Sequence, residues 1–240
     1  MNENDAKEVA ARFGGSAATY DMVAKVQSRL AERLAEAAAP FIAPECDILD
    51  VGCGTGCLVK RIAASVKPLR VSLMDISGEM LKLAARNVAA LCDILVDCYI
   101  GDAETMPWPA SNAVVSSSAV QWFENPLTFV SKAREVLTEG GVVALATYGP
   151  STFAELRGGR PCGYPSLDDW LRALTEAGFE ILCSDRSVEE QSFASRTEML
   201  RMMALSGIGT NRDGQSTEAM NGTWRLTWEP LLIVAKLPNP

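Results

Sequence analysis

The sequence contains no histidine, and this absence restricts the chemistry that the chain can carry out. Histidine is the commonest general base and the side chain that titrates nearest to pH 7. Without it the chain has no Ser-His-Asp or Cys-His nucleophile pair and no zinc site that uses histidine. We therefore expect a reaction that needs little proton transfer, or one in which Asp, Glu, Tyr or Cys moves the proton.

Other patterns are also missing. The seven cysteines are odd in number and form no C-x-x-C pair, so we expect reduced thiols in the cytosol and no metal site. No apolar run approaches the roughly 20 residues of a membrane span, and the acidic N-terminus does not resemble a secretory signal. The net charge of −8 disfavours nucleic acid and anionic membranes as partners. These observations together predict a soluble cytoplasmic protein.

Strand and helix patterns alternate along the chain from residue 46 onward, which is typical of an α/β fold with a mostly parallel sheet and helices on both faces. The "EGG" at 139–141 predicts a helix stop, and Ser77 is an expected helix N-cap. The predicted strands cover 46–51, 69–75, 94–102, 112–119, 142–148 and 225–237, and the predicted helices cover 56–65, 77–91, 126–137, 166–179 and 196–205.

Two further helices, 5–13 and 20–39, precede the first strand and are separated by "GGSAAT". With no internal repeat or low-complexity linker, we expect residues 1–240 to form one domain. Residues 1–40 would form a helical cap or lid, and 150–165 and 190–222 would lie on the substrate side.

The stretch "ILDVGCGTG" carries the first functional signal, because Gly52, Gly54 and Gly56 follow a strand in the pattern G-x-G-x-G. The dinucleotide fingerprint has one more residue between its last two glycines, and an acid such as Asp50 before the loop would repel a pyrophosphate. Asp75 and Asp102 follow the next two strands. Three acids around a glycine loop suit a cationic nucleoside that carries an amino acid, namely S-adenosylmethionine (SAM), and a nicotinamide cofactor is a distant alternative.

Longer stretches carry a resemblance. "LDVGCGTG", "MDIS", "GDAETMPW" and "EVLTEGG" resemble class I SAM-dependent methyltransferases. "RFGGSAATYD", "SSSAVQWFENP", "LATYGPSTFAELR", "MLRMMALSGIGTN" and "LTWEPLLIVAK" are similar, in order, to segments of the malonyl-acyl-carrier-protein O-methyltransferases of biotin synthesis. The resemblance implies a Rossmann-like, seven-stranded sheet and methylation of the free malonyl carboxylate. This reaction needs no base, because a carboxylate is already ionised at neutral pH.

The resemblance also implies site residues. Arg201 is the first candidate for holding the malonyl carboxylate, Arg157 is a weaker one, and Tyr20 resembles the family's lid tyrosine. Gln121 and Trp122 are expected to shape the pocket. The chain departs from the family pattern at Gly15, at Ser117 and in a shortened segment after Arg157. The predicted cofactor-binding residues are Asp50, Gly52, Gly54, Gly56, Asp75, Ile76, Met80, Asp102, Ala103, Ser117 and Ser118.

Carrier protein is the expected partner, with malonyl-CoA as a second possible substrate. The carrier is acidic, so docking would need a local basic surface, and Lys25, Arg29 and Arg33 are spaced to share one helix face. Two alternatives to the malonyl reaction stay open. One is a class I methyltransferase for another small carboxylate or hydroxyl, and the other is a catalytically silent SAM-binding protein.

Overall fold

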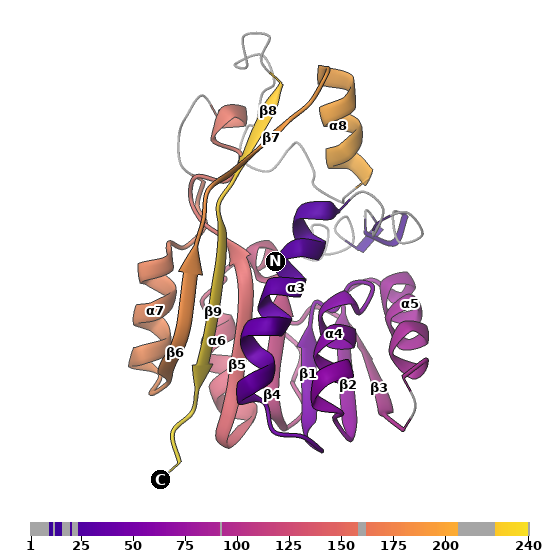
Figure 1. Ribbon diagram of the computed structural model, residues 1–240, viewed down its shortest axis with the longest axis vertical. Helices are drawn as coiled ribbons and strands as arrows, with labels where there is room; N and C mark the ends of the chain where they lie inside the picture. The colour runs from indigo at the N-terminus through magenta and orange to yellow at the C-terminus, as the bar shows by residue number, and fades with distance from the viewer. Residues whose placement is uncertain are drawn as a thin grey trace.

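A computed structural model describes residues 10–11, 13–15, 20, 24–91, 93–157, 162–205 and 224–239 of the chain. Its centre is a seven-stranded sheet in the order β3-β2-β1-β4-β5-β9-β6 (Figure 1). β9 runs antiparallel to its two neighbours, β5 and β6, and the other neighbouring strands of this sheet pair in parallel. This confirms the predicted Rossmann-like, mostly parallel sheet. The strands are β1 Asp47–Val51, β2 Arg70–Asp75, β3 Leu95–Ile100, β4 Ser111–Ser117, β5 Leu137–Tyr148, β6 Glu180–Arg186 and β9 Pro230–Lys236.

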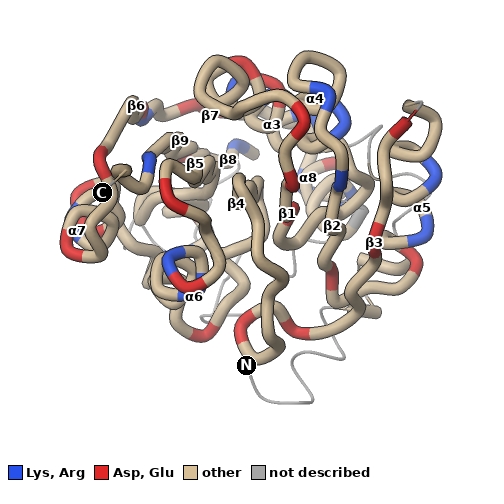
Figure 2. The backbone as a smooth tube through the Cα atoms, turned by 90° about the horizontal axis from the view of Figure 1, so that it is seen from below, with Lys and Arg blue, Asp and Glu red and all other residues tan. Residues whose placement is uncertain are grey.

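Helices cover both faces of the sheet, as predicted, and each face has its own apolar cluster. Figure 2 shows α3 and α4 on one side of the row of strands and α6 and α7 on the other. Leu30, Ile62 and Leu81, from three different helices, belong to one buried cluster, whereas Phe129 and Trp170 belong to the other. The helices are α3 Lys25–Ala38, α4 Cys57–Val66, α5 Gly78–Ala89, α6 Thr128–Val136, α7 Leu167–Glu176 and α8 Arg196–Leu205.

Local sequence signals explain where two of these helices begin. Ser77 is the N-cap of α5, and its side chain accepts a hydrogen bond from the backbone N–H of Met80, as predicted. Ser166 and Asp169 form a reciprocal capping box at the start of α7. Among the described residues there are also short 3₁₀ helices at η1 Ala39–Phe41, η2 Val120–Trp122 and η3 Ala154–Arg157.

The predicted strand 225–237 is wrong in one respect, because the chain forms two strands there. β8 Arg225–Trp228 pairs with β7 Glu189–Ser192 in a separate two-stranded sheet, and β9 begins at Pro230. Between them lies Glu229, which is 2% exposed and whose carboxylate accepts hydrogen bonds from the Ser151 N–H and the Arg186 guanidinium. These contacts hold the chain at the bend, and they connect segments that the strand pattern could not relate.

The glycines of "EGG" also differ from their predicted role. Helix α6 ends at Val136, and β5 begins at once and runs through residues 139–141 instead of following them. The pairs Ser111–Leu137 and Ala113–Val142 enclose extra residues in β5, so the strand bulges there, and Gly140 has a φ of +72°. The glycines therefore permit a bulge within the strand.

In Figure 1 the β7–β8 ribbon and α8 stand above the end of the sheet where the parallel strands have their carboxyl ends. The predicted helix 5–13 and substrate-side segment 190–222 lie partly outside the described residues, as does 150–165. Within the described part of the chain, no helix combines the length and hydropathy needed to span a membrane.

Candidate active site

The glycine loop adopts a conformation that other residues rarely reach. Gly52, Gly54 and Gly56 all have positive φ, at +67°, +52° and +78°. A Cβ at Gly52 would overlap the Cβ of Ala119, and a Cβ at Gly56 would lie 3.2 Å from the Cα of Ala84. Nothing lies within 4 Å of the corresponding position at Gly54. Two of the glycines therefore let the loop pack closely against its neighbours, whereas Gly54 faces open space.

Asp50 is the most unusual side chain of the site. It is 1% exposed, and neither carboxylate oxygen has a hydrogen-bond partner of good geometry among the described residues. Burial raises the pKa of Asp50 to about 8, the neighbouring Asp75 adds to the rise, and the backbone N–H of Val59 offsets part of it. A buried carboxylate with no hydrogen bond of good geometry is costly, so its position in a pocket indicates a cationic or hydrogen-bond-donating ligand.

Asp75 connects the glycine loop to α5. Its Oδ2 accepts a hydrogen bond from the Gly54 N–H at 2.9 Å, and its Oδ1 accepts one from the Ser77 N–H at 2.8 Å. Burial raises the pKa of Asp75, and these backbone hydrogen bonds oppose the rise. The backbone N–H of Ile76 also bonds to this carboxylate, which leaves at least one of its four lone pairs to accept a hydrogen bond from a ligand.

Asp102 reaches the same pocket from the turn after β3. Its Oδ1 accepts a hydrogen bond from the Glu104 N–H at 2.9 Å, and the carbonyl of Ala103 accepts one from the indole of Trp108. These bonds fix the turn whose first residues face the cavity. The three acids therefore converge because three parallel strands end at the same edge of the sheet, as the sequence predicted.

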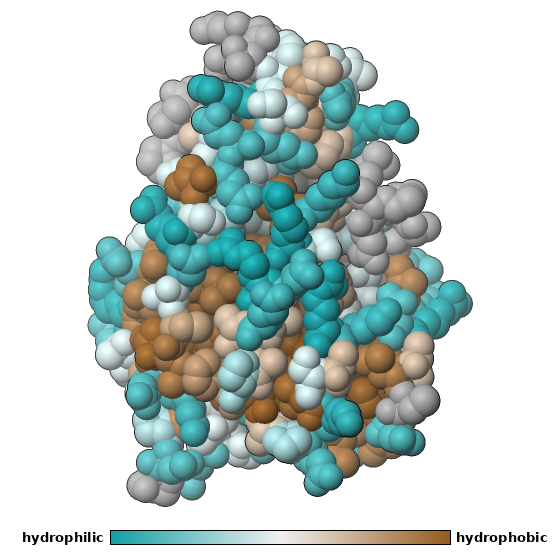
Figure 3. Space-filling model, in the orientation of Figure 1, coloured by the Kyte–Doolittle hydropathy of each residue, from teal (hydrophilic) through white to brown (hydrophobic). Residues whose placement is uncertain are grey.

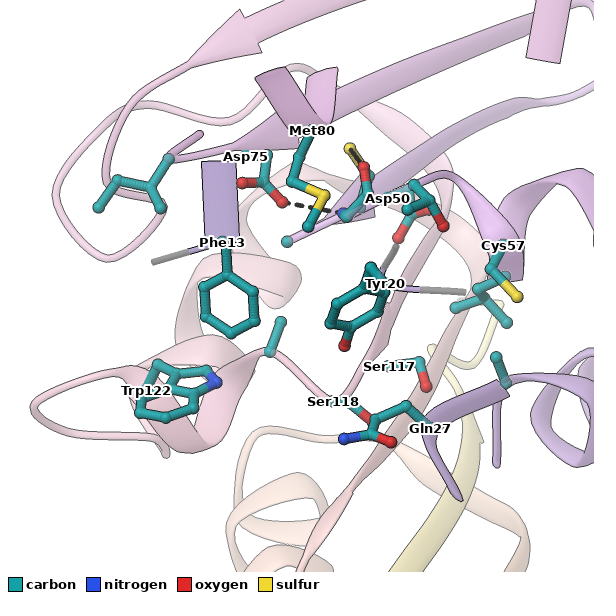
Figure 4. Close-up of a pocket in the computed structure, with 18 of the residues that line it drawn as sticks. Phe13, Tyr20, Gln27, Asp50, Cys57, Asp75, Met80, Ser117, Ser118 and Trp122 are labelled. Carbon is teal, nitrogen blue, oxygen red and sulfur yellow. Dashed lines mark hydrogen bonds between the residues drawn. The ribbon is translucent and has the colours of Figure 1, made fainter. Parts of the chain in front are cut away.

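One pocket contains nearly all of the predicted cofactor residues (Figure 4). Gly56 is the exception, because it packs against α5 instead of facing the cavity. Among the described residues that line the pocket there are three aspartates and no lysine or arginine. The predicted residues that line it are Asp50, Gly52, Gly54, Asp75, Ile76, Met80, Asp102, Ala103, Ser117, Ser118, Tyr20 and Trp122.

An aromatic group closes one side of this pocket. The Phe13 ring makes edge-to-face contacts with Tyr20, at 6.1 Å between centroids, and with Trp122, at 5.7 Å. Figure 4 shows the three rings facing the same space from the N-terminal segment and from η2. Phe13 was not predicted as a site residue. Its only signal was its place in "RFGG", within the stretch that resembles the family's opening.

Other lining residues were also missed, including Gln27 and Ser28 of α3 and Cys57 of α4. Both α3 residues are polar and partly buried between the buried Val26 and Leu30. This interruption of the apolar face was the available signal. Gln121, by contrast, was expected to shape the pocket, but it does not line it and its Oε1 accepts a hydrogen bond from the Thr147 hydroxyl.

The structure brings neither predicted arginine into the pocket. Arg157 is buried in η3, where its guanidinium donates a hydrogen bond to the Thr152 carbonyl. Arg201 is exposed on α8, and Met199 and Met203 of the same helix are buried. Arg157 therefore supports the loop after β5, and Arg201 lies outside the described lining.

The predicted basic face of α3 is largely neutralised. Arg29 forms an ion pair with Glu189 at 3.0 Å, and Arg33 pairs with Asp185. Figure 3 shows the corresponding hydrophilic band where α3 meets β6 and β7. Lys25 is exposed, so α3 does not present the row of three free cations that its spacing suggested.

Several of the known proteins that this chain resembles are named as methyltransferases, in agreement with its fold and with its glycine loop. A family model described as a methyltransferase domain matches residues 48–141. A malonyl-[acyl-carrier protein] O-methyltransferase of Bacteroides thetaiotaomicron is 27% identical over 95% of this chain and 97% of its own length. The biotin biosynthesis bifunctional protein BioHC of Teredinibacter turnerae is 26% identical over 89% of this chain, which spans only 40% of that longer protein.

Among solved structures, a protein from Bacillus halodurans assigned as a methyltransferase superposes with a TM-score of 0.65. It is 23% identical and the match covers 87% of this chain and 99% of that one, which shows a shared fold. The family model shows a methyltransferase domain over residues 48–141, and the sheet order and the glycine loop with its acids agree with it.

Proposed function

We propose that this chain transfers the methyl group of SAM to the free carboxylate of malonyl-acyl carrier protein in the cytoplasm. The observation that carries the cofactor half is the Asp50 carboxylate, buried beside the glycine loop with no partner of good geometry among the described residues. The ammonium group of SAM would supply both a positive charge and hydrogen-bond donors there. Asp75 would accept hydrogen bonds from the ribose, which agrees with its place at the end of β2.

The acceptor half of the proposal rests on the relatives. A protein named for malonyl-acyl-carrier-protein methylation matches this chain over 95% of its residues, which includes the segments outside the glycine loop. The composition is compatible with the same reaction, because a histidine-free pocket can methylate a group that is already ionised.

SAM supplies an electrophilic methyl group on a positively charged sulfur. An oxygen of the malonyl carboxylate forms a bond to this methyl carbon, the carbon–sulfur bond breaks, and its electron pair stays on sulfur. The residues of the chain bind and orient the two substrates and exclude water. Phe13, Tyr20 and Trp122 form an apolar side of the pocket, and a carboxylate attacks more readily there because it has lost part of its hydration.

The proposal is tested by incubating the purified protein with SAM labelled in its methyl group. Malonyl-acyl carrier protein, malonyl-CoA and free malonate serve as separate acceptors, and the methyl ester is measured by mass. We expect ester on the carrier-bound malonyl group, and no ester when acetyl-acyl carrier protein replaces it.

Two results would contradict the proposal in different ways. Ester formed only on a free acid would indicate a methyltransferase for another small carboxylate. SAM binding with no ester on any acceptor would indicate a silent SAM-binding protein.

A further inference from the structure

Ser118 has a strained backbone next to the pocket. It follows β4 with a φ of +56°, a conformation that costs a residue with a side chain about 1 kcal/mol or more. Its N–H donates to the carbonyl of Ala146 at 2.9 Å, and the next residue, Ala119, packs where Gly52 lacks a Cβ. The turn is thus fixed between β5 and the glycine loop. These contacts hold Ser118 in its strained backbone conformation, in which it lines the cavity.

A buried tyrosine stands behind this serine. The hydroxyl of Tyr148, at the end of β5, lies 3.0 Å from Ser118 Oγ, and Tyr148 is 3% exposed. Burial raises the pKa of Tyr148 and the hydrogen bond to Ser118 opposes the rise, so the phenol stays protonated at neutral pH. When Tyr148 donates this hydrogen bond, the Ser118 O–H is left to donate into the pocket.

The neighbouring serine adds a second donor. Ser117 Oγ is buried and has no hydrogen-bond partner among the described residues, although Ser117 lines the pocket. Figure 4 shows the two serines together on a wall away from Asp75. Two adjacent hydroxyl donors on one wall match the oxygens of a carboxylate, which accepts hydrogen bonds and donates none.

We propose that Ser117 and Ser118 hold an oxygen of the acceptor's carboxylate, and that Tyr148 is a positioning residue that acts through Ser118. The inference rests on the proposed function, because it takes the acceptor to be a carboxylate. It assigns acceptor binding to hydroxyl groups of the pocket wall, where the described lining has no cation, instead of to Arg201, and it gives Ser117 and Ser118 a different role from the cofactor binding predicted from the sequence. The positive charge of bound SAM offsets the negative charge of the carboxylate.

The test compares Ser118→Ala, Tyr148→Phe and the double variant. For each variant, kcat and KM are measured with malonyl-acyl carrier protein, and SAM affinity is measured by calorimetry. We expect Ser118→Ala to lower kcat/KM about tenfold, since it removes a hydrogen bond to a charged group, with SAM affinity changed less than about twofold. Tyr148→Phe should lower kcat/KM about fivefold on its own and have no further effect when Ser118 is already alanine.

Three controls separate this role from a structural one. Tyr99→Phe removes a hydroxyl from β3, outside the pocket, and should leave kcat/KM unchanged. Ser118→Gly relieves the backbone strain and should lower kcat/KM as much as Ser118→Ala. Ser118→Ala leaves the Tyr148 hydroxyl buried without its partner, so adding Tyr148→Phe should recover thermal stability without recovering activity.

The proposal is overturned if the single variants keep wild-type kcat/KM, or if SAM affinity falls as much as kcat/KM, which would place the pair in the cofactor site. Equal losses from Tyr148→Phe in both backgrounds would show that Tyr148 does not act through Ser118. Absence of methyl ester with the wild-type protein would overturn the proposed function and this inference together. An active wild type with unaffected variants would overturn this inference alone.

Discussion

The two sides of the pocket differ in how their residues are held. On the side of the glycine loop, Gly54 and Asp75 are fixed by backbone conformation and by hydrogen bonds from nearby N–H groups to the Asp75 carboxylate, and Asp50 lies buried at the end of β1. On the opposite side, Phe13 and Trp122 are 109 residues apart in the chain and meet through their rings. A local pattern can therefore specify the first side, whereas the second depends on how distant segments pack.

The largest effect is expected from Gly52→Ala. A new Cβ at this position would overlap Ala119, so either the glycine loop or the turn after Ser118 must move. We expect SAM affinity to fall about a hundredfold, from an overpacking cost of about 2.7 kcal/mol. Isothermal calorimetry measures this directly.

The matched control for Gly52 is Gly178→Ala. Gly178 also has a positive φ, +88°, but nothing lies within 4 Å of the position that a Cβ would take there. This variant should lose about 1 kcal/mol of stability and keep its SAM affinity. Equal losses of affinity in both variants would mean that backbone strain, and not the contact with Ala119, explains the effect of Gly52→Ala.

Asp50→Asn should have the next largest effect, because asparagine keeps the shape of the side chain but cannot become negatively charged when the ammonium group of SAM binds. A hydrogen bond to a charged group contributes about 1.5–3 kcal/mol, so SAM affinity should fall about thirtyfold. Asp97→Asn is the control. Asp97 lies on the half-exposed strand β3, outside the pocket, and forms an ion pair with Arg70 of β2. Unchanged affinity in the Asp50 variant would remove this residue from the cofactor site.

The raised pKa of Asp50 also predicts that the stability of the protein without bound SAM depends on pH. Its pKa is about 8 in the folded chain, above the ordinary value near 4, so the folded chain binds more protons than the unfolded chain between these pH values. Unfolding free energy should therefore fall as the pH rises from about 4 to about 8, and the Asp50→Asn variant should show a shallower fall. Urea unfolding at several pH values measures both slopes, and parallel slopes would contradict the raised pKa.

Substitutions on the aromatic side of the pocket should lower SAM affinity less than the substitutions above. Edge-to-face pairs contribute about 0.5–1.5 kcal/mol beyond the area that they bury, so Phe13→Leu or Trp122→Leu should weaken SAM binding about fivefold. A double-mutant cycle should show coupling between the two positions. Phe41→Leu, at a residue that is 42% exposed and outside the pocket, should have no effect. Strictly additive losses would mean that the two rings do not act together on the cofactor.

The smallest effect is expected from Arg201→Ala. Arg201 is exposed on α8, and an exposed charge contributes less than about 1 kcal/mol, so KM for the carrier substrate should rise about twofold to threefold without a change in SAM affinity. Arg134→Ala, on the exposed part of α6, is the control. If Arg201→Ala lowered kcat/KM more than Ser118→Ala does, Arg201 and not Ser118 would be the residue that binds the malonyl carboxylate.

Prediction from the sequence succeeded where the signal was local. Ser77 caps α5, and Asp50, Asp75 and Asp102 reach one pocket because parallel strands end at one edge. It failed at Glu229, where the final strand breaks in two, because the contacts that hold the bend come from Ser151 and Arg186. No periodicity in 225–237 contains that information.

The basic face of α3 shows that prediction from sequence is also limited for surface charge. The spacing of Arg29 and Arg33 correctly places them on a helix, but their acidic partners Glu189 and Asp185 lie more than 150 residues away. Whether a surface cation is available to a partner depends on such pairs. Sequence spacing can therefore predict a shared face but not its net charge.

By itself the sequence determined the α/β class, the glycine loop and the three acids, because backbone restrictions at glycine and the geometry of parallel strands act over a few residues. Only the tertiary structure decided that the predicted arginines stay out of the pocket, that Phe13 meets Trp122, and that Tyr148 supports Ser118. These facts depend on distances between segments far apart in the chain, which the packing of the whole sheet and its helices sets.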